Sequence, residues 1–410
     1  MNNALYFQSG GVTAVIGATA AALIEAHRQV SQGRLFAAEH GLSGLMNGQL
    51  VDASALPEPM RLALSHLPGG GLGSGRTLLE PYEQNPTQWQ RVRDVLVAHH
   101  IGTIYVNGGN GSMDTAAKLV ELSNRFSLDL KVIGLPKTID NDLEGTDASP
   151  GFGSALKYLS VSLMEAARDH CAMATKPSVF ILEAMGRHTG WLATCGAVAR
   201  LPEAMTAPLV LFPEVVFNPA HFVATVRARA QGHNAVVCVV SEGICTADGA
   251  FYAQQNPAAK YGHEQLGGAG LAVGALLRAE LGVKVHVAIP DYMQRAARHL
   301  ASATDIAQAE AVARHGVSLA QRGQTGFMVN IVRDSDSPYR WHCDAVALTD
   351  IANRERRLPL DWIDTERYTI RPEALTYLRP LIAGEISLPW SAGLPDYPWV
   401  EWPKVMPLQA

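Results

Sequence analysis

Short apolar runs alternate with longer amphipathic stretches along most of this chain. The alternation is typical of a parallel sheet covered by helices, because buried parallel strands are apolar throughout while each covering helix keeps a polar side. Strands are expected at Ala4–Gln8, Thr103–Val106, Lys131–Gly134, Ser178–Leu182, Pro208–Phe212, Ala235–Val240, Val285–Ile289 and Phe327–Val332. Helices are expected at Ala14–Gln32, Thr87–His99, Met113–Phe126, Gly153–His170, Pro219–Ala230, Leu271–Leu281 and Ala307–Gln321. The sequence therefore predicts an α/β fold.

Length and composition exclude several classes of protein. A chain of 410 residues suggests two or three domains, and its net charge of −5 argues against nucleic acid as the main partner. No apolar run reaches the ~18 residues of a membrane helix, and no signal core follows the start, so we expect a cytoplasmic protein without a membrane partner. The five cysteines form no Cys-x-x-Cys pair, which argues against disulfides and zinc. From about Ser335 the periodicity weakens, and we expect an irregular arm packed on a domain or a partner subunit.

Three glycine clusters fall where strands give way to loops or helices, at residues 10–11, 69–75 and 108–111. Without Cβ atoms, backbone amides can approach a phosphate, and a helix that begins after the loop adds its positive end. A turn that only packs a helix against a strand explains each cluster equally well. The chain has no Gly-Lys dipeptide and no suitably placed Gly-x-Gly-x-x-Gly, so neither a P-loop ATPase nor an NAD dehydrogenase is favoured.

The loop 135–143 is more specific, because it puts a cation, a hydroxyl and two carboxylates at the end of a predicted strand. Lys137 could neutralise phosphate oxygens, and Asp140 or Asp142 could take a proton from an attacking alcohol or hold Mg²⁺. This is the chemistry of phosphoryl transfer. The alternative is an Asx-turn, in which Asp140 and Asn141 bond their own backbone.

Three further loops leave predicted strands, at residues 183–192, 241–243 and 290–295. Arg187 lies on a glycine-flanked turn and could reach a phosphate, or it could lie over Trp191 as an ordinary surface arginine. Each of these loops taken alone is an ordinary strand end.

Taken in order, the motifs resemble the phosphofructokinases, and within them the pyrophosphate-dependent branch. They are Ser9-Gly10-Gly11 and residues 108–114, 136–142, 185–191, 241–243 and 294–295, and they span nearly the whole chain. The resemblance implies two Rossmann-like three-layer domains, with the chain crossing between them twice. The phosphoryl donor would bind residues 1–150 plus about 293–360, and fructose 6-phosphate would bind 151–292 plus about 361–410. It also implies Mg²⁺ and a homodimer or homotetramer whose neighbouring subunit helps to hold the sugar phosphate.

The resemblance also implies individual roles. Asp140 would take the proton from the C1 hydroxyl of fructose 6-phosphate, Thr138 would contact the reacting groups, and Asp142 would support the site. The implied sugar-phosphate residues are Met185, Gly186, Arg187 and Glu242, with Tyr292 and Arg295 at the 6-phosphate. The implied donor residues are Gly11, Arg76, Gly109, Asn110, Gly111 and Lys137, and the implied Mg²⁺ residues are Asn110, Asp140 and Asp142.

Some positions depart from the family pattern. Gly17 stands where many relatives have asparagine. Ser178 and His286 stand where nucleotide-dependent relatives place arginines that reach a neighbour's active site. Lys176 and Lys284, each two residues upstream, are candidates to replace that charge or are plain surface lysines.

The donor residues are a mixture of two patterns. Lys137 and Asn110 resemble the pyrophosphate branch, in which the lysine ammonium lies where a nucleotide's remaining phosphate would be. Gly111 is glycine, as in ATP users, where the pyrophosphate branch usually has an aspartate that excludes ATP. We favour pyrophosphate, with an ATP-dependent phosphofructokinase as the alternative. A kinase with a Gly-Gly-x-Gly-Ser loop, as in lipid and NAD kinases, and a catalytically silent sugar-phosphate-binding subunit also stay open.

Overall fold

The computed structural model describes residues 3–202, 205–253 and 267–405. Two compact units divide the chain, unit 1 (Met1–Ser154, Arg295–Glu355 and Ala383–Ala410) and unit 2 (Ala155–Gln294 and Arg356–Ile382). The chain therefore passes from one unit to the other four times, after Ser154, Gln294, Glu355 and Ile382, and not twice as expected. No helix within the described ranges is both long and apolar enough to cross a membrane.

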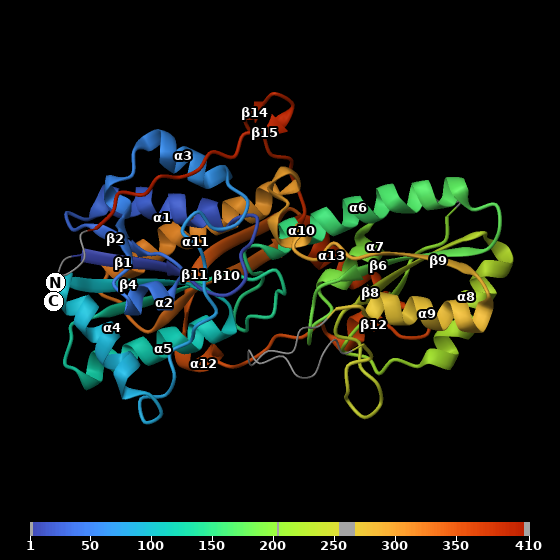
Figure 1. Cartoon of the computed structure of the whole chain (residues 1–410), viewed down its shortest axis with the longest axis horizontal. Helices are drawn as coiled ribbons and strands as arrows, with labels where there is room; N and C mark the ends of the chain where they lie inside the picture. Colours follow the sequence, from blue (N-terminus) through green and yellow to red (C-terminus); the bar gives the residue numbers. More distant parts are fainter. Residues whose placement is uncertain (1–2, 203–204, 254–266, 406–410) are drawn as a thin grey trace. The chain divides into compact units, whose positions relative to one another are not determined.

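Unit 1 is built on a seven-stranded sheet in the order β11-β10-β5-β4-β1-β2-β3 (Figure 1). Its strands are β1 (Asn3–Gln8), β2 (Leu35–Ala38), β3 (Leu50–Asp52), β4 (Ile101–Gly108), β5 (Lys131–Pro136), β10 (Phe327–Asp336) and β11 (Tyr339–Ala347). The pairs from β10 through β5, β4 and β1 to β2 are parallel, whereas β3 and β11 run antiparallel at the two edges. The carboxyl ends of β1, β4 and β5 therefore meet at one edge of the sheet.

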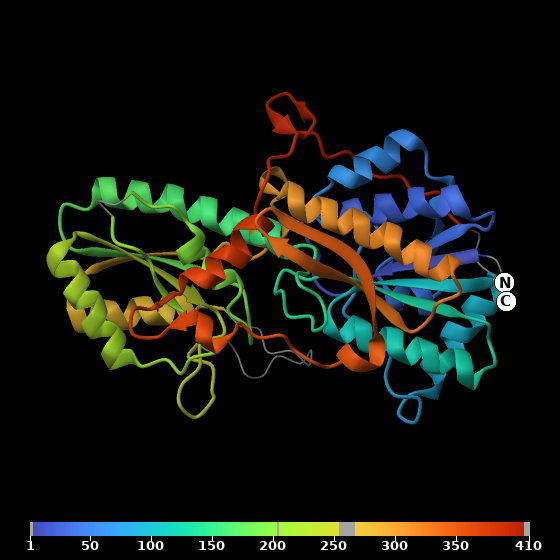
Figure 2. The same cartoon turned by 180° about the vertical axis from the view of Figure 1, so that it is seen from behind.

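Helices cover both faces of this sheet, because alternate strand residues enter two separate cores. Leu5 and Phe7 of β1 pack in one core, and Ala4 and Tyr6 pack in the other. The first core includes α4 (Pro86–Ala98), α5 (Asn110–Arg125) and the short α2 (Leu42–Met46) and α12 (Leu348–Ile351), and the second includes α1 (Ile16–Val30), α3 (Glu58–His66) and α11 (Ala303–Gln321). Figure 2 shows α11 lying along the β10–β11 hairpin.

Unit 2 contains a four-stranded sheet whose neighbouring strands are all parallel, in the order β7-β8-β6-β9. Its strands are β6 (Ser178–Ala184), β7 (Leu209–Leu211), β8 (Ala235–Ser241) and β9 (Lys284–Ala288). The remaining helices are α6 (Phe152–Met173), α7 (Cys195–Val198), α8 (Pro219–Gly232), α9 (Ala269–Leu281), α10 (Met293–Ala296) and α13 (Pro372–Leu381). Short 3₁₀ turns are found at Ala53–Ala55, Leu192–Thr194, Arg298–Leu300 and Leu360–Trp362, and two-residue strands at Ile363–Asp364 (β12), Thr369–Ile370 (β13), Trp390–Ser391 (β14) and Leu394–Pro395 (β15).

The predicted α/β fold with mainly parallel sheets is confirmed, and each expected strand is present within a few residues of its predicted bounds. The expectation of an irregular arm from Ser335 was wrong, because β11 and α13 are regular. Residues 339–344 of β11 alternate between half-buried and exposed positions, which is the pattern of a half-buried edge strand. The chain from Ala383 onward also belongs to unit 1 rather than to the second domain, and Lys404 pairs with Val51 of β3.

Candidate functional site

The glycine turn after β1 is fixed by the glycine-rich loop 69–76. Gly10 has a φ of +80°, which favours glycine, and its N–H donates to Gly75 O at 2.9 Å. The Ser74 hydroxyl donates to Gly10 O at 2.6 Å. The third glycine cluster adjoins them, because the Lys137 N–H donates to Gly108 O at 3.0 Å. All three predicted glycine clusters therefore lie at the edge where β1, β4 and β5 end.

Lys137 points its ammonium into this edge. Its side chain is buried, and Nζ donates to Ser9 O at 2.8 Å and to Gly11 O. Burial lowers the pKa of Lys137 to about 7, and the Asp140 carboxylate opposes part of that shift. The lysine thus places a titratable positive charge directly under the Ser9–Gly11 turn.

Asp140 lies in the loop after β5, next to Thr138. The Asp140 N–H donates to Thr138 Oγ1 at 3.1 Å, and that hydroxyl lies 3.4 Å from Asp140 Oδ2. Burial raises the pKa of Asp140, while the Thr138 hydrogen bond and the charge of Lys137 oppose the rise. The Asx-turn alternative would have the Asn141 side chain bond its own neighbouring backbone. Instead, Asn141 Oδ1 accepts the Ser149 N–H at 3.0 Å, and this hydrogen bond spans the loop.

Asn110 and Asp142 bring oxygen atoms together at the start of α5. Asn110 Nδ2 donates to Asp142 Oδ2 at 3.1 Å and to Asp142 O at 3.2 Å. Among the described residues, Asn110 Oδ1 and Asp142 Oδ1 are buried without a hydrogen-bond partner. Burial and the neighbouring Asp140 carboxylate raise the pKa of Asp142 to about 7. The described chain holds no cluster of three or more His, Cys, Asp or Glu suited to a metal, but amide and carboxylate oxygens are the protein ligands that fit Mg²⁺.

Arg295 lies in unit 1 beside the Ser9–Gly11 turn, although the resemblance implies a role at the sugar 6-phosphate. A Cβ atom added to Gly11 would stand 2.7 Å from Arg295 Nη1, so the guanidinium lies directly against this glycine and would have to shift for any side chain there. The charges of Arg295 and of the exposed Arg76 both help to keep Asp140 ionised. Gly11, Arg76, Lys137, Asp140 and Arg295 are called the phosphate cluster below.

Gly111 is covered by a leucine. A Cβ atom added there would stand 3.3 Å from both Leu78 Cδ1 and Leu78 Cδ2. Gly109, two residues earlier, approaches Thr138, whose Cβ would be 3.9 Å from an added Cβ atom. Leu78 therefore fills the space beside Gly111 that a side chain at this position would occupy.

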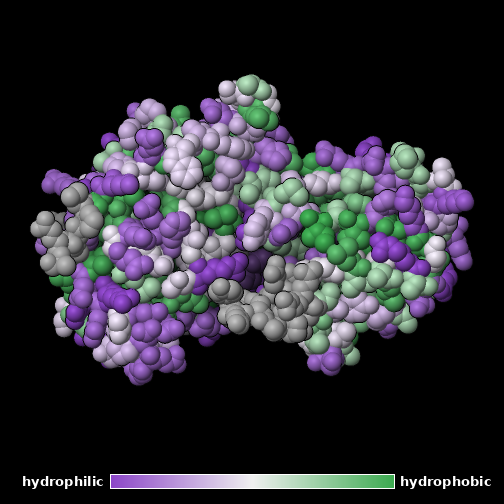
Figure 3. All heavy atoms as spheres, in the orientation of Figure 1, coloured by the Kyte–Doolittle hydropathy of each residue, from purple (hydrophilic) through white to green (hydrophobic). Residues whose placement is uncertain are grey.

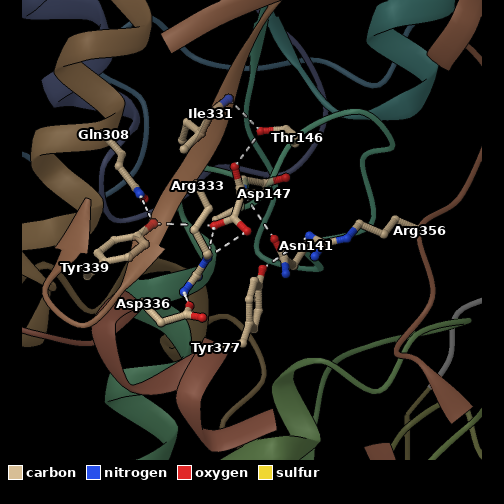
Figure 4. A network of polar contacts seen from close by, with 12 residues as sticks. Asn141, Thr146, Asp147, Gln308, Ile331, Arg333, Asp336, Tyr339, Arg356 and Tyr377 are labelled. Carbon is tan, nitrogen blue, oxygen red and sulfur yellow. Dashed lines mark hydrogen bonds and ion pairs between the residues drawn. The ribbon is translucent and has the colours of Figure 1, made fainter. Parts of the chain in front are cut away.

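A polar network holds Thr146 and Asp147, which follow Asp140 in the same loop, on β10 (Figure 4). Arg333 pairs with Asp147 at 2.9 Å and with Asp336 at 2.7 Å. The Thr146 hydroxyl accepts the Ile331 N–H at 3.0 Å, and the Asp147 N–H donates to Ile331 O at 2.8 Å. The loop that carries Asp140 is thus fixed to the sheet downstream of the carboxylate, which limits its freedom to move.

The predicted sugar residues gather at the carboxyl ends of β6 and β8 in unit 2. Glu242 Oε1 accepts the Gly186 N–H at 3.2 Å, and the Ser241 hydroxyl donates to Gly186 O at 2.8 Å. The N–H of Met185 donates to the side chain of the buried Gln294 at 3.1 Å. Met185, Gly186, Arg187 and Glu242 are called the sugar cluster below, and Tyr292 is 67% exposed in the loop after β9.

Trp191 is a core residue of unit 2. It is fully buried, its indole N–H donates to Arg356 O at 3.1 Å, and the Arg356 guanidinium lies 4.7 Å from its ring centroid. Glu214, which the sequence analysis missed, accepts N–H groups from Gly190 at 2.8 Å and Leu358 at 3.1 Å. No sequence motif marked Glu214, because both of its partners are backbone groups.

Ser178 and His286 lie away from the sugar cluster of this chain. Ser178 is the first residue of β6 and is paired with Lys284, whereas the sugar cluster follows the last residue of that strand. The Ser178 hydroxyl lies 3.4 Å from His170 Nε2, and the His170 and His286 rings are 6.0 Å apart. Close packing explains the glycine at position 17, because an added Cβ atom would stand 2.3 Å from Leu64 O.

Comparisons with known proteins agree with this geometry. The family model described as Phosphofructokinase matches residues 3–320. Two proteins named pyrophosphate–fructose 6-phosphate 1-phosphotransferase, from Methylococcus capsulatus and Halomonas elongata, are each 44% identical and align over 96% of this chain and 95% of their own. The crystal structure of a pyrophosphate-dependent phosphofructokinase from Nitrosospira multiformis is 38% identical, with a TM-score of 0.91 over 100% of this chain and 99% of its own.

This two-unit α/β protein is thus similar in sequence and fold to sugar-phosphate phosphotransferases. The chain belongs to the phosphofructokinase family.

Proposed function

We propose that this chain transfers a phosphoryl group from pyrophosphate to the C1 hydroxyl of fructose 6-phosphate, which yields fructose 1,6-bisphosphate and phosphate. The observation that carries the proposal is the buried ammonium of Lys137 under the Ser9–Gly11 turn, next to the Asp140 carboxylate. The identity of 44% with phosphotransferases of that name over 96% of the chain supports it. Unit 1 would bind the donor and unit 2 the sugar phosphate.

Asp140 acts as the general base in this proposal. Its burial raises its pKa and makes it a stronger base, while the nearby cations keep it ionised. Thr138 fixes the carboxylate through its hydroxyl and its contact with the Asp140 N–H. The C1 hydroxyl would lose its proton to Asp140 as it attacks the phosphorus, and no covalent enzyme intermediate is needed.

The cations of the phosphate cluster stabilise the charge on the transferring phosphoryl group. Lys137, Arg76 and Arg295 bring three positive charges to one turn, and preorganised charges of this kind lower the barrier to phosphoryl transfer. Asn110 and Asp142, together with Asp140, would hold Mg²⁺. When bound, Mg²⁺ would neutralise phosphate oxygens.

Leu78 supports pyrophosphate over ATP despite the glycine at position 111. The leucine methyl groups stand against Gly111, so the glycine does not leave an open space for a larger donor. Lys137 adds a cation that a small dianionic or trianionic donor can contact directly. An ATP-dependent phosphofructokinase is the second candidate, and the glycine itself is the observation that favours it.

In unit 2, Met185, Gly186, Arg187 and Glu242 would bind fructose 6-phosphate, with Tyr292 nearby. A homodimer or homotetramer in the cytoplasm is part of the proposal, with Lys176 and Lys284 of a neighbouring subunit as candidate phosphate ligands. The test of the function is direct. Purified protein, pyrophosphate, fructose 6-phosphate and Mg²⁺ should give fructose 1,6-bisphosphate and phosphate in equal amounts, and no product with either substrate omitted.

Substitution of Arg295 tests the proposed role of the phosphate cluster in the reaction. We expect Arg295→Ala to lower kcat by about 10²-fold, because the guanidinium beside Gly11 stabilises the reacting phosphoryl group. The KM for fructose 6-phosphate should rise as well, as the resemblance implies. Steady-state kinetics with both substrates varied measure the two effects. A rise in that KM with kcat unchanged would restrict Arg295 to sugar-phosphate binding.

The affinity of the metal-free protein for pyrophosphate should depend on pH through Lys137. The lysine has a lowered pKa of about 7, so it is charged below pH 7 and loses its charge, and its attraction for pyrophosphate, above it. From pH 6 to pH 8.5 we expect the affinity of wild type, relative to that of Lys137→Met, to fall roughly tenfold or more. Isothermal titration of both proteins measures this ratio and cancels the ionisation of pyrophosphate itself. A constant ratio would contradict the prediction.

A further inference from the structure

The last described residues of the chain run across unit 1 and pair with the edge strand β3. Residues 383–405 are called the C-terminal arm here. Lys404 forms an antiparallel bridge with Val51 of the edge strand β3, and the Asp52 N–H donates to Pro403 O at 2.7 Å. The β14–β15 hairpin near the start of the arm stands out from the surface (Figure 3). The distal part of the arm is therefore fixed, although no function has been given to it.

Just before it reaches β3, the arm contacts the glycine-rich loop 69–76. The Trp402 indole N–H donates to Gly71 O at 2.8 Å. Val400 is 4% exposed and packs in the same core as Leu64 and Leu67, whose methyl groups face Gly71. The arm thus holds Gly71 by one polar and one apolar contact.

The same loop supports the phosphate cluster four residues later. Gly75 O accepts the Gly10 N–H at 2.9 Å, and the Ser74 hydroxyl donates to Gly10 O at 2.6 Å. An added Cβ atom on Gly10 would stand 3.5 Å from Lys137 Nζ. A short series of contacts therefore joins Trp402 to the turn over the lysine ammonium.

A loop so rich in glycine needs an external support. Five of the seven residues from Gly69 to Gly75 are glycines, and Gly69 and Gly73 have φ values of +70° and +71°. Glycine loses more backbone freedom on ordering than any other residue, so such a loop samples many conformations unless other contacts hold it. The arm supplies contacts of this kind from outside the loop.

We infer that Trp402 and Val400 are positioning residues for phosphoryl-donor binding. They hold the loop 69–76 in the conformation that presents Arg76 and fixes the Gly10 turn, so that the arm sets the affinity for the donor without touching it. This inference rests on the proposed donor role of the phosphate cluster. A purely structural arm would instead stabilise the whole unit and affect both substrates alike.

Trp402→Phe separates these two roles, because it keeps an aromatic side chain and removes the N–H donor. We expect the KM for pyrophosphate to rise about threefold to tenfold, the effect of one lost hydrogen bond, while kcat and the KM for fructose 6-phosphate change less than twofold. Trp399→Phe is the matched control, since Trp399 is on the same arm and 88% exposed. An unchanged KM for pyrophosphate, or equal rises in both KM values, would overturn the inference.

Amide hydrogen exchange gives a readout that does not need turnover. In Trp402→Phe, exchange should quicken in peptides that cover residues 69–76 and stay unchanged in peptides that cover β6 and β8. Unchanged exchange in the loop would overturn the coupling between arm and loop. The donor role itself is tested separately by Arg76→Ala, because an unchanged KM for pyrophosphate in that variant would remove the proposed role of the loop while leaving the exchange result intact.

Discussion

Asp140→Asn should lower kcat by about 10²- to 10⁴-fold, the usual cost of removing a positioned general base. Asparagine keeps the size of the side chain and the contact of the backbone N–H with Thr138 Oγ1. It cannot accept the proton of the C1 hydroxyl. The affinity for fructose 6-phosphate, measured by isothermal titration, should stay close to that of wild type.

Single-turnover kinetics measure the chemical step for this variant and avoid a limit set by product release. Asp129→Asn is a suitable control, because Asp129 is an exposed carboxylate just before β5 and should leave kcat unchanged. If Asp140→Asn retains more than about a tenth of the wild-type rate of the chemical step, Asp140 is not the base.

Lys137→Gly should lower kcat/KM with pyrophosphate by about 10²- to 10³-fold, the cost of removing one preorganised positive group at a reacting phosphate. The same change should raise the ratio of ATP to pyrophosphate activity, because it removes the buried ammonium under the Ser9–Gly11 turn and opens space there. Initial rates with each donor at saturating fructose 6-phosphate give both quantities.

Gly111→Asp is the companion variant for donor choice. An added Cβ atom at position 111 lies 3.3 Å from the methyl groups of Leu78, which is 39% exposed, so a small shift of the leucine should accommodate the new side chain and pyrophosphate activity should be retained. Any activity with ATP should fall, because a carboxylate beside a nucleotide phosphate costs several kcal/mol. The contrary result has three parts: the wild-type protein uses mainly ATP, Gly111→Asp loses most of that activity, and Lys137→Gly leaves the donor preference unchanged. That result would mean that Gly111 decides the donor.

Sequence reasoning located the sheet well because most strands of unit 1 are buried on both faces. β1, β4 and β5 are buried along nearly their whole length and are mostly apolar, and their ends carry the motifs of the phosphate cluster. The short β2 and β3, with four and three residues, were missed since so few positions carry no readable period. The path of the C-terminal arm was also missed, because it depends on an edge strand that had not been predicted.

Within the candidate site, the chemistry could be predicted better than the contacts. The residue types at 137, 138, 140 and 142 suffice to indicate phosphoryl transfer. The burial of Lys137 under two carbonyls, the position of Arg295 over Gly11 and the cover that Leu78 gives to Gly111 all depend on how separate loops meet. Contacts between loops that are far apart in the sequence leave no periodic pattern, so only the structure reveals them.

Donor choice tests the central claim most directly. With fructose 6-phosphate and Mg²⁺ saturating, kcat/KM of the wild-type protein should be at least tenfold higher with pyrophosphate than with ATP, a difference of about 1.4 kcal/mol in transition-state stabilisation. A value at least tenfold higher with ATP would contradict the assignment of pyrophosphate as the donor.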